Sequence, residues 1–149
     1  MTPEVMEFVK SLKLSGGTLE IGSYDVNGSI RHLFNGSYMG LDRRQGPNVD
    51  RVCDGHQISF QDGVFDNVIC LETLEHDECF WMTISEMKRV LKSGGRLVIT
   101  VPGFGFPRHD YPSDYYRFSK DAVQAFYSGL RDVTVTEQNN AIYSHGVKP

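Results

Sequence analysis

The sequence predicts a doubly wound α/β sheet. Two observations lead to this prediction: apolar strand patterns alternate with helical patterns along the chain, and two of the strand patterns end on an acid. Alternating strands and helices form parallel sheets, which bind ligands at the carboxyl ends of their strands. With 149 residues the chain is long enough for one core and short for two, so we expect a single domain over residues 1–149.

The overall charge argues against two classes of partner. The net charge is −4 and no run of lysine and arginine occurs. Nucleic-acid grooves and membrane surfaces are bound through clustered cations, so we expect neither nucleic acid nor a membrane as a partner. No apolar run approaches the ~20 residues of a membrane span, and acids occur near the start of the chain, which predicts a cytoplasmic protein.

The cysteines give no sign of a metal or a disulfide. Cys53, Cys70 and Cys79 form no CxxC pair and are odd in number. A disulfide framework and a zinc site are therefore both disfavoured, and buried free thiols are expected. The sequence predicts no metal ion.

Residues 3–14 predict a first amphipathic helix. Val5, Val9 and Leu12 recur at helical spacing, and Pro3 stands near the start, where proline is tolerated. We expect the apolar stripe to cover one edge of the sheet. A partner-binding face is the weaker alternative, because such stripes usually belong to a core.

The next stretch, residues 18–29, is the one around which the rest of the chain is organised. An apolar strand carries Glu20 almost at its end, a turn with Gly22 and Gly28 follows, and residues 29–34 have a helical pattern. A strand, a glycine turn and a helix start bring backbone N–H groups close to a ligand. The acid would repel a pyrophosphate, so it favours a ligand with a cationic amino-acid end. The alternative is an ordinary turn with a solvated glutamate.

Two further strands end on acids. Residues 37–42 predict a strand that ends on Asp42, at the distance from Gly22 where the residue that binds ribose hydroxyls is expected. Gly46 and Pro47 then exclude a long helix and predict a short, loop-like connection. A brief strand over residues 49–53 leads to Asp54, which can accept a hydrogen bond from an adenine amino group. The alternatives are a solvated Asp42 and an Asp-Gly turn at Asp54.

The middle of the chain predicts a buried strand, a helix and another strand. Residues 64–71 are nearly continuous in apolar side chains, as in buried parallel strands, and the following residues to His76 should reach the ligand edge of the sheet. Residues 79–95 have helical spacing and should end at Gly94-Gly95. Residues 96–103 predict the fifth strand. The polar side chains that we expect at the ligand edge are Glu72, Thr73, Glu75 and His76.

The last third predicts a long loop, a helix and two strands. Residues 104–118 are rich in proline, glycine and aromatic side chains, without periodicity, and make a loop longer than compact domains usually keep. Ser119 should cap the helix that follows it. Residues 131–138 and 141–149 look like two antiparallel strands at the far edge of the sheet.

Two parts of the sequence resemble the class I (Rossmann-like) S-adenosylmethionine-dependent methyltransferases. The stretch EIGSYDVNGS resembles their motif I, although Tyr24 and Val26 stand where glycines are usual, as in small methyltransferases of the bacterial and phage type. The block from FDNVICLETLEH to EMKRVLKSGGRLVITVPG resembles their strand, Leu-Glu-His, helix and strand pattern. Together they cover about three quarters of the chain.

The resemblance implies the fold and the cofactor contacts. The fold would be a mostly parallel seven-stranded sheet of order 3-2-1-4-5-7-6, with the seventh strand antiparallel and helices on both faces. The cofactor would be S-adenosyl-L-methionine. The implied contacts are Glu20, Gly22, Ser23, Tyr24, Asn27, Gly28, Asp42, Arg43, Asp54, Gly55, His56 and Glu72.

The implied function is transfer of a methyl group to an acceptor. We expect His76 and His109 to be catalytic, because histidine can remove a proton near neutral pH. Tyr111, Tyr115 and Arg117 of the long loop are expected nearby, with Arg117 holding an anionic acceptor. The alternatives are that His76 only caps the following helix and that the aromatic residues at 115–118 belong to the core.

The acceptor is expected to be a small molecule or a sugar, and a protein is the second choice. An amino-methyltransferase of nucleic acid would show an Asn/Asp-Pro-Pro-Tyr/Phe signature after the fourth strand, where this chain has LETLEH. Two other functions remain open. A nucleotide-binding oxidoreductase shares the scaffold, although Glu20 and the missing glycines oppose it, and a cofactor-binding protein without catalysis would have the same sequence features.

Overall fold

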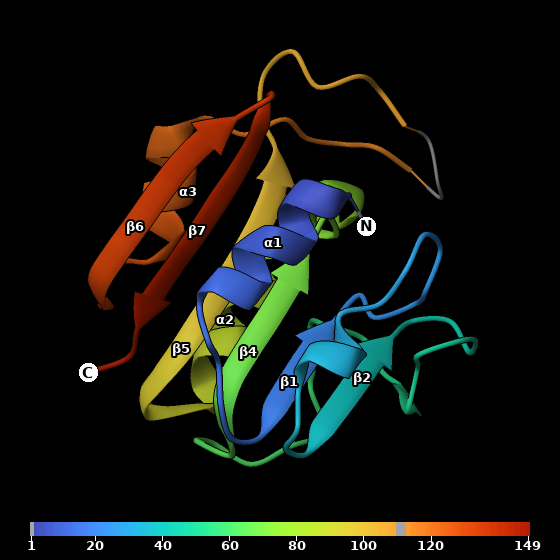
Figure 1. Ribbon diagram of the computed structural model, residues 1–149, viewed down its shortest axis with the longest axis vertical. Coiled ribbons are helices and arrows are strands. Elements are labelled where there is room, and N and C mark those ends of the chain that lie inside the picture. Colours follow the sequence, from blue (N-terminus) through green and yellow to red (C-terminus); the bar gives the residue numbers. More distant parts are fainter. Residues whose placement is uncertain (1, 110–112) are drawn as a thin grey trace.

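The computed structural model describes residues 2–109 and 113–149 and contains a seven-stranded sheet (Figure 1). The strands run in the order β3-β2-β1-β4-β5-β7-β6, and β7 is antiparallel to both of its neighbours. This confirms the strand order that the resemblance implied. The strands are β1 (Thr18–Ile21), β2 (Tyr38–Asp42), β3 (Arg51–Val52), β4 (Phe65–Leu71), β5 (Leu91–Pro102), β6 (Arg131–Gln138) and β7 (Ala141–Val147).

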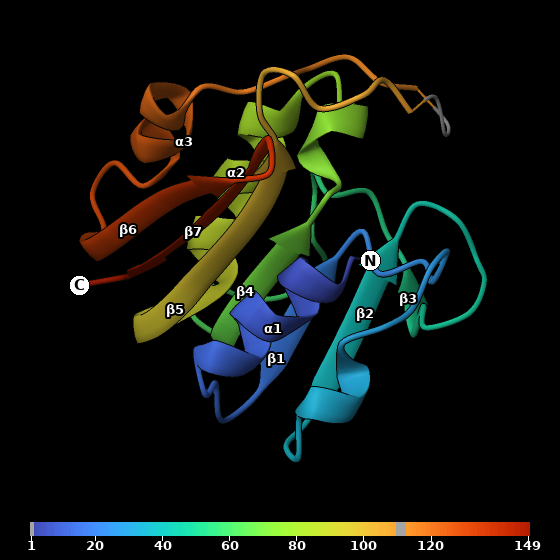
Figure 2. The ribbon, with the colours of Figure 1, turned by 45° about the horizontal axis from the view of Figure 1, so that its top comes forward.

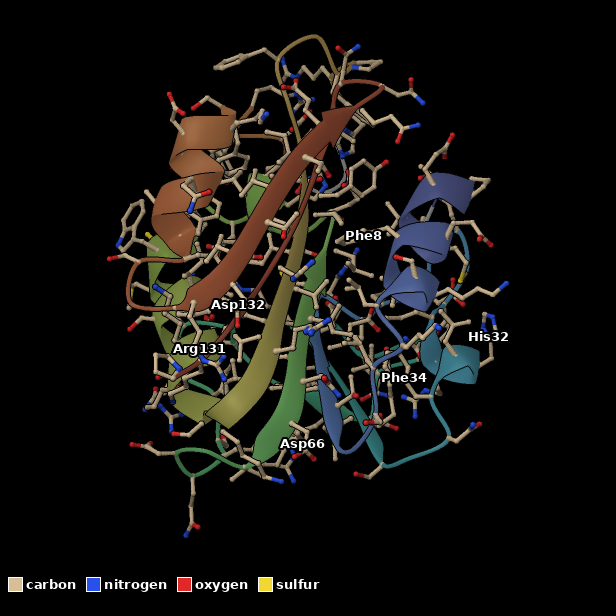
Figure 3. The ribbon with its side chains drawn as sticks, turned by 60° about the vertical axis from the view of Figure 1, so that its left-hand side comes forward. Phe8, His32, Phe34, Asp66, Arg131 and Asp132 are labelled. Atoms are coloured by element: carbon tan, nitrogen blue, oxygen red, sulfur yellow. The ribbon has the colours of Figure 1, made fainter. Side chains whose placement is uncertain are left out.

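Helices cover both faces of the sheet, as Figure 3 shows from the side. One face carries α1, and the opposite face carries α2 and α3. The α-helices are α1 (Pro3–Ser11), α2 (Phe80–Val90) and α3 (Lys120–Phe126), and the short 3₁₀ turns are η1 (Arg31–Leu33) and η2 (Leu74–His76). The expected position of α1 at a sheet edge was wrong. Val5 and Val9 pack against Val98 and Tyr143, so α1 lies across β5 and β7 on the face.

Successive side chains of the central strands point to opposite faces of the sheet, so each face has its own part of the core. In β4, Val68 and Cys70 point to the α2 and α3 side, whereas Ile69 and Leu71 point to the α1 side. All of these side chains are at most 6% exposed. Burial on both faces explains why the strand reads as a nearly continuous apolar run. The core is therefore thickest around β4, whose carboxyl end becomes the middle of the cleft described below.

The helix expected over residues 29–34 is absent from the structure, and only the η1 turn forms there. The segment between β1 and β2 is rich in turn-forming residues, and the hydroxyl of Ser29 accepts a hydrogen bond from the N–H of Arg31, which favours a local turn over a helix. Ile30 is fully buried and, with Leu33 and Phe34, joins the core on the α1 side. A short turn with buried apolar side chains therefore stands where the crossover helix was expected. No helix N-terminus faces the turn at Gly22.

Helix α2 ends earlier than the sequence indicated. The helix stops at Val90, and Leu91 is already extended, with ψ near 132°. Leu91 is fully buried and pairs with Phe65 of β4, so packing against the sheet ends the helix. Gly94 and Gly95, which were expected to stop the helix, instead lie inside β5, where they exchange backbone hydrogen bonds with Lys148.

The C-terminal part of the chain agrees with the predictions. The hydroxyl of Ser119 accepts a hydrogen bond from the N–H of Ala122 and caps α3. Residues 104–109 and 113–118 are loop segments that pass over the carboxyl end of the sheet (Figure 2). In the described part of the chain, none of the helices has the length and apolar character needed to cross a lipid bilayer.

Candidate functional site

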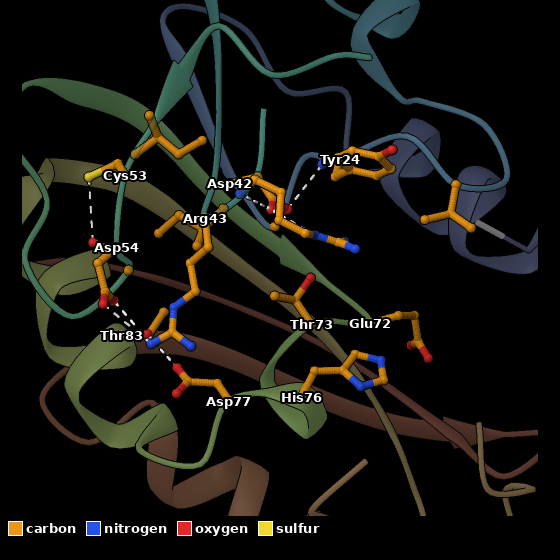
Figure 4. A pocket seen from close by; sticks show the side chains of 16 residues that line it. Tyr24, Asp42, Arg43, Cys53, Asp54, Glu72, Thr73, His76, Asp77 and Thr83 are labelled. Carbon is orange, nitrogen blue, oxygen red and sulfur yellow. Dashed lines mark hydrogen bonds and ion pairs between the residues drawn. The ribbon is translucent and has the colours of Figure 1, made fainter. Parts of the chain in front are cut away.

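The carboxyl ends of four parallel strands meet at one edge of the sheet. Ile21 of β1 pairs with Leu41 of β2 and with Cys70 of β4, and Asp42 pairs with Val52 of β3. The residues that follow these strands therefore share one edge, where they line a cleft of about 300 Å³ (Figure 4). The lining residues are Ile21, Gly22, Tyr24, Val26, Leu41, Asp42, Arg43, Arg44, Cys53, Asp54, Gly55, Glu72, Thr73, His76, Asp77 and Thr83.

Gly22 makes the first turn of the cleft, and its position requires glycine. Its φ is +77°, and a Cβ atom there would lie 2.1 Å from the hydroxyl oxygen of Thr73. The N–H groups of Gly22 and Ser23 both donate to the carbonyl oxygen of Leu41, at 2.9 Å. The chain therefore bends tightly against β2 and β4 and leaves room in front of the strand ends. Tyr24 follows on the cleft wall, with the guanidinium of Arg44 4.5 Å from the centre of its ring.

Asp42 lies at the end of β2 and is held by backbone donors. Its carboxylate accepts hydrogen bonds from the N–H of Arg44 at 2.9 Å and from the N–H of Tyr24 at 3.3 Å. The side chain is 12% exposed and faces the cleft. One backbone N–H binds each oxygen and orients the carboxylate, and Nε of Arg44 lies 3.6 Å from Oδ1, so the second acceptor site of Oδ2 can serve a ligand hydroxyl.

Asp54 belongs to a network on the β3 side of the cleft. Arg43 approaches both of its oxygens at 3.3 Å, and in Figure 4 the guanidinium of Arg43 lies between Asp54 and Asp77. The pKa of Asp54 is lowered, first by the hydrogen bond from the N–H of His56 and then by the charge of Arg43. Asp54 is therefore a carboxylate, about half exposed, that faces a ligand entering from solvent.

Asp77 connects the cleft to the start of α2. Its carboxylate accepts hydrogen bonds from the hydroxyl of Thr83 at 2.6 Å and from the N–H of Cys79 at 3.0 Å. Nε2 of His56 lies 2.7 Å from the same carboxylate. His56 is thereby held beside the cleft and is not part of its lining. The sequence analysis missed Asp77 and Thr83, although an aspartate just ahead of a helical pattern is a helix-capping signal that marks such a position.

Glu20 is not on the cleft surface, although it was predicted as a cofactor contact. It is 3% exposed and accepts hydrogen bonds from the hydroxyl of Tyr38 and from the side-chain amide of Asn48. Burial raises the pKa of Glu20 to about 7, against the opposing effects of these donors and of Arg31. The alternation of β1 explains the difference, because Leu19 and Ile21 face the α2 side and Glu20 points to the opposite face.

Glu72 and His76 form the end of the cleft beyond β4. Glu72 has a φ of +46°, an uncommon conformation for a residue with a side chain, which turns the chain sharply after the strand. Burial raises the pKa of Glu72, and the neighbouring Glu75 adds to the effect. His76 does not cap a helix, since its Nδ1 hydrogen-bonds to the carbonyl oxygen of Ser113 in the long loop. Figure 4 shows the side chains of Glu72 and His76 close together.

The two predicted catalytic histidines come together. The ring centres of His76 and His109 are 4.8 Å apart, although the residues belong to η2 and the long loop. Tyr115 is 50% exposed and donates its N–H to the backbone carbonyl oxygen of Glu75, whereas Tyr116 and Phe118 pack on the core, as one alternative had it. The prediction for Tyr111 lies outside the described residues.

Arg117 holds the long loop together and does not face a ligand. Its guanidinium binds Asp114 on both carboxylate oxygens and donates to the carbonyl oxygens of Phe106, Pro107 and Tyr116. These contacts oppose the predicted role of Arg117 in holding an anionic acceptor. They also keep the pKa of Asp114 well below its usual range.

The remaining predicted contacts divide between the cleft and its surroundings. Gly22, Tyr24, Asp42, Arg43, Asp54, Gly55, Glu72 and His76 line the cleft. Asn27 and Gly28 lie in an exposed turn, where the N–H of Gly28 donates to Asp25, and Ser23 is buried at 3% exposure. The three cysteines are free thiols, of which Cys70 is buried and Cys53 lines the cleft.

Part of the chain matches a known family. Residues 35–99 match the model of a methyltransferase domain, a segment that runs from before β2 to within β5 and contains Asp42, Asp54, Glu72 and His76. No curated protein matches the chain at a significant level.

Solved structures share the fold over nearly the whole chain. A protein from Thermotoga maritima, an S-adenosylmethionine-dependent methyltransferase described as a possible histamine N-methyltransferase, has 16% identity and a TM-score of 0.79 over 97% of this chain and 87% of its own. A methyltransferase from Aquifex aeolicus has 14% identity and a TM-score of 0.65, over 97% and 89%. Phosphoethanolamine N-methyltransferase 2 of Haemonchus contortus, in complex with S-adenosyl-L-methionine, has 19% identity and a TM-score of 0.72, over 96% of this chain and 52% of its own.

Proposed function

We propose that the chain is a class I S-adenosylmethionine-dependent methyltransferase, whose fold it shares and whose domain model matches residues 35–99, and that it methylates a small-molecule or sugar-like acceptor on oxygen or nitrogen. The cofactor would lie in the cleft at the carboxyl edge of the sheet. Its ribose would meet Asp42, its adenine would meet Asp54, and its methyl group would point to the end formed by Glu72 and His76.

The observation that carries this proposal is the pairing of Asp42 and Asp54 on one cleft. Both follow the ends of adjacent parallel strands, and both keep acceptor sites that face the cleft. Ribose hydroxyls and an adenine amino group are donors, and a carboxylate accepts such bonds strongly. The tight bend at Gly22 leaves the room that the cofactor needs next to these carboxylates.

The charge of the cleft suits a cationic cofactor. Among the described lining residues, Asp42, Asp54, Glu72 and Asp77 carry carboxyl groups, and Arg43 and Arg44 carry the arginine charges. The cofactor brings a sulfonium and an ammonium group, which such an acidic excess attracts. A dinucleotide would bring a pyrophosphate, which the same excess repels, so the oxidoreductase alternative is disfavoured.

The acceptor side supports a small molecule. Two of the similar structures carry names that refer to histamine and phosphoethanolamine, both small amines. His76 and Glu72 lie at the end of the cleft where an acceptor would meet the methyl group. Transfer at a sulfonium needs alignment and exclusion of water and, for a hydroxyl or amine acceptor, a way to lose a proton. We assign this last task to the surroundings of His76 and His109.

Calorimetry with S-adenosyl-L-methionine and its demethylated product tests the proposal. We expect binding of both to the wild type and no binding of NAD. Asp42→Ala removes one charge-assisted hydrogen bond, worth ~1.5 to 3 kcal/mol, and should weaken binding about tenfold or more. Asp121→Ala is the matched control, because Asp121 is exposed in the first turn of α3, away from the cleft.

Two outcomes would contradict parts of the proposal. Equal affinity of the wild type and Asp42→Ala would refute the assigned position of the cofactor. Tight cofactor binding without turnover on a panel of small hydroxyl and amine acceptors would favour the alternative of a cofactor-binding protein without catalysis. Turnover on a protein acceptor would replace the small-molecule assignment.

A further inference from the structure

Three side-chain atoms of the kinds that bind metal ions lie close together, next to the end of the cleft that Glu72 and His76 form. An oxygen of Glu75 and the Nε2 atoms of His76 and His109 all lie within 4.8 Å of one another. Oε1 of Glu75 is 3.3 Å from Nε2 of His109 and 3.6 Å from Nε2 of His76. Two ligands that share one ion at about 2.1 Å each are roughly 3.0 to 3.4 Å apart at octahedral or tetrahedral angles. The two measured separations are therefore close to those of a common ion.

The carboxylate of Glu75 is buried without adequate compensation. Glu75 is 0% exposed, and neither of its oxygens has a hydrogen-bond partner among the described residues. The same holds within the described residues for Oε1 of the neighbouring Glu72. An ionised carboxylate in this situation costs several kcal/mol unless a positive charge or a set of donors compensates it. A cation bound beside Glu75 would compensate this buried charge.

Both histidines are oriented as metal ligands. A carbonyl oxygen only accepts hydrogen bonds, so the contact between Nδ1 of His76 and the carbonyl of Ser113 places the proton on Nδ1. Nδ1 of His109 lies 3.3 Å from the carbonyl oxygen of Pro107 and 3.6 Å from Asp114. With the proton on Nδ1, the lone pair of Nε2 in each ring can face Glu75. The contact with Glu75 raises the pKa of His109, so a metal ion would compete there with a proton on Nε2. Backbone and carboxylate partners of this kind fix the tautomer of metal-binding histidines.

We propose that Glu75, His76 and His109 bind one divalent first-row transition-metal ion of the zinc or manganese type, with Glu72 as an additional oxygen donor beside it. Two imidazoles favour such ions over magnesium and calcium, which prefer oxygen ligands. A set of two histidines and one carboxylate also leaves coordination positions open to a substrate. The sequence analysis predicted no metal, and the three side chains of the proposed site come from η2 and from a loop far along the chain, without a known ligand spacing.

The site adjoins the cleft at its acceptor end, since His76 and Glu72 belong to the cleft lining. The following consequence rests on the proposed function. The ion would bind an acceptor hydroxyl and lower its pKa, as bound metal ions do for water. The hydroxyl proton would pass to solvent, and the acceptor oxygen would form a bond to the methyl carbon. The sulfur–carbon bond would break with its electron pair staying on sulfur, which becomes a neutral thioether. The histidines would then be ligands and not bases.

Metal binding to untagged, chelator-treated protein tests the proposal. We expect one equivalent of Zn²⁺ or Mn²⁺ by calorimetry and by elemental analysis after dialysis, and a visible absorption spectrum with Co²⁺. His109→Ala should weaken binding at least about tenfold, the effect of losing one ligand. His109 is the safer variant because its side chain is 38% exposed, whereas Glu75→Gln changes a buried group and needs a check of folding by circular dichroism.

The matched control is His32→Ala. His32 is an exposed residue of η1, far from the long loop, and Figure 3 shows it pointing outward. Its loss should leave metal affinity and stoichiometry unchanged. If the wild type retains no metal, or if His109→Ala binds as the wild type does, Glu75 is compensated by a protonated histidine and the proposal is wrong.

A second titration separates this proposal from the proposed function. The demethylated cofactor is titrated into the chelator-treated protein. Cofactor binding without any metal binding would overturn the metal site alone. Metal binding without cofactor binding would support the metal site and overturn the proposed function.

Discussion

Tyr38 donates a hydrogen bond from its hydroxyl to Oε2 of Glu20, and the two side chains lie on adjacent strands below the cleft. Burial is the main cause that raises the pKa of Glu20, and it raises the pKa of Tyr38 well above its usual value. The pair therefore prefers a proton on each group. Neutral Glu20 thus has a structural role below the turn at Gly22. Ionisation of its carboxyl group lowers the stability of the fold.

We predict that Glu20→Gln removes a pH dependence of stability. Because the pKa of Glu20 is about 7 in the fold, against 4.5 for an ordinary glutamate side chain, the folded chain binds more protons than the unfolded chain between these pH values. The contribution of this group to the free energy of unfolding therefore falls as pH rises through that window. Glutamine keeps the hydrogen-bond acceptor and stays neutral, so the variant should gain on the wild type by up to about 3 kcal/mol between pH 5 and pH 8.

Urea denaturation of both proteins at the two pH values measures this gain. Glu7→Gln is the control, since the side chain of Glu7 is 72% exposed and should give no such difference. An equal stability difference between Glu20→Gln and the wild type at both pH values would refute the assignment.

We predict that Gly22→Ala damages the cleft as well as the backbone. A Cβ atom at this position would meet the side chain of Thr73 at 2.1 Å, in addition to the strain of a positive φ. Gly129→Ala is the matched control, because Gly129 has a similar φ of +84° with nothing within 4 Å of the added atom. The control should lose about 1 kcal/mol of stability through backbone strain alone.

Gly22→Ala should lose more stability than this control and should also weaken binding of the demethylated cofactor about tenfold or more, as loss of one good contact does. Denaturation and calorimetry on both variants give the comparison. Unchanged cofactor affinity in Gly22→Ala would place the cofactor elsewhere.

We predict that Arg117→Ala loosens the long loop. Arg117 binds Asp114 and three backbone carbonyl groups, and its side chain is only 18% exposed, so its loss leaves several acceptors unpaired. The stability loss should be about 1 to 3 kcal/mol, and residues 104–118 should become sensitive to limited proteolysis. Arg131→Ala removes an exposed pair with Asp132 and should change stability by less than about 0.5 kcal/mol. Equal protease resistance of the two variants would show that the loop is held by other contacts.

We predict no salt-dependent binding to DNA or RNA. The net charge of −4 and the absence of a lysine and arginine run leave few cations to displace counterions. A gel shift at low salt with single-stranded and double-stranded probes measures it. Tight binding that weakens steeply as salt rises would overturn this expectation.

The strands could be predicted from the sequence because their signals are local. The apolar runs around Leu19, Val68 and Ile99 mark the buried strands β1, β4 and β5, and Asp42 and Asp54 come where β2 and β3 end. The helices were harder to delimit. The helical spacing of apolar residues predicted a helix over residues 29–34. The chain forms only a short turn there, and Ile30 is buried in the core. Burial of Leu91 similarly ended α2 before its glycine pair, which is a tertiary effect that local propensity does not contain.

The site was predicted in part for the same reason. Residues directly after strand ends, such as Gly22 and Asp54, reach the cleft because strand direction alone places them there. Glu20 lies on the face away from the cleft because one step along a strand reverses the face. His56 is held by Asp77, 21 residues along the chain, and Arg117 by Asp114, three residues before it, and no strand pattern reveals either contact. The approach of His109 to His76 depends on the path of the long loop, which no pattern in the sequence determines.

The end of the sheet opposite the cleft has a practical consequence. Gly63 precedes β4 and Gly94 lies in the first part of β5, both at that end, and space around Gly94 is open, with no atom within 4 Å of an added Cβ. A fluorescent dye or a surface linker attached there, through Ser93→Cys in a chain whose partly exposed Cys53 and Cys79 are replaced by serine, would sit at the pole remote from both ligand sites. Immobilised protein would then present its cleft to solution in one orientation, which suits it to screening acceptor libraries on a sensor chip.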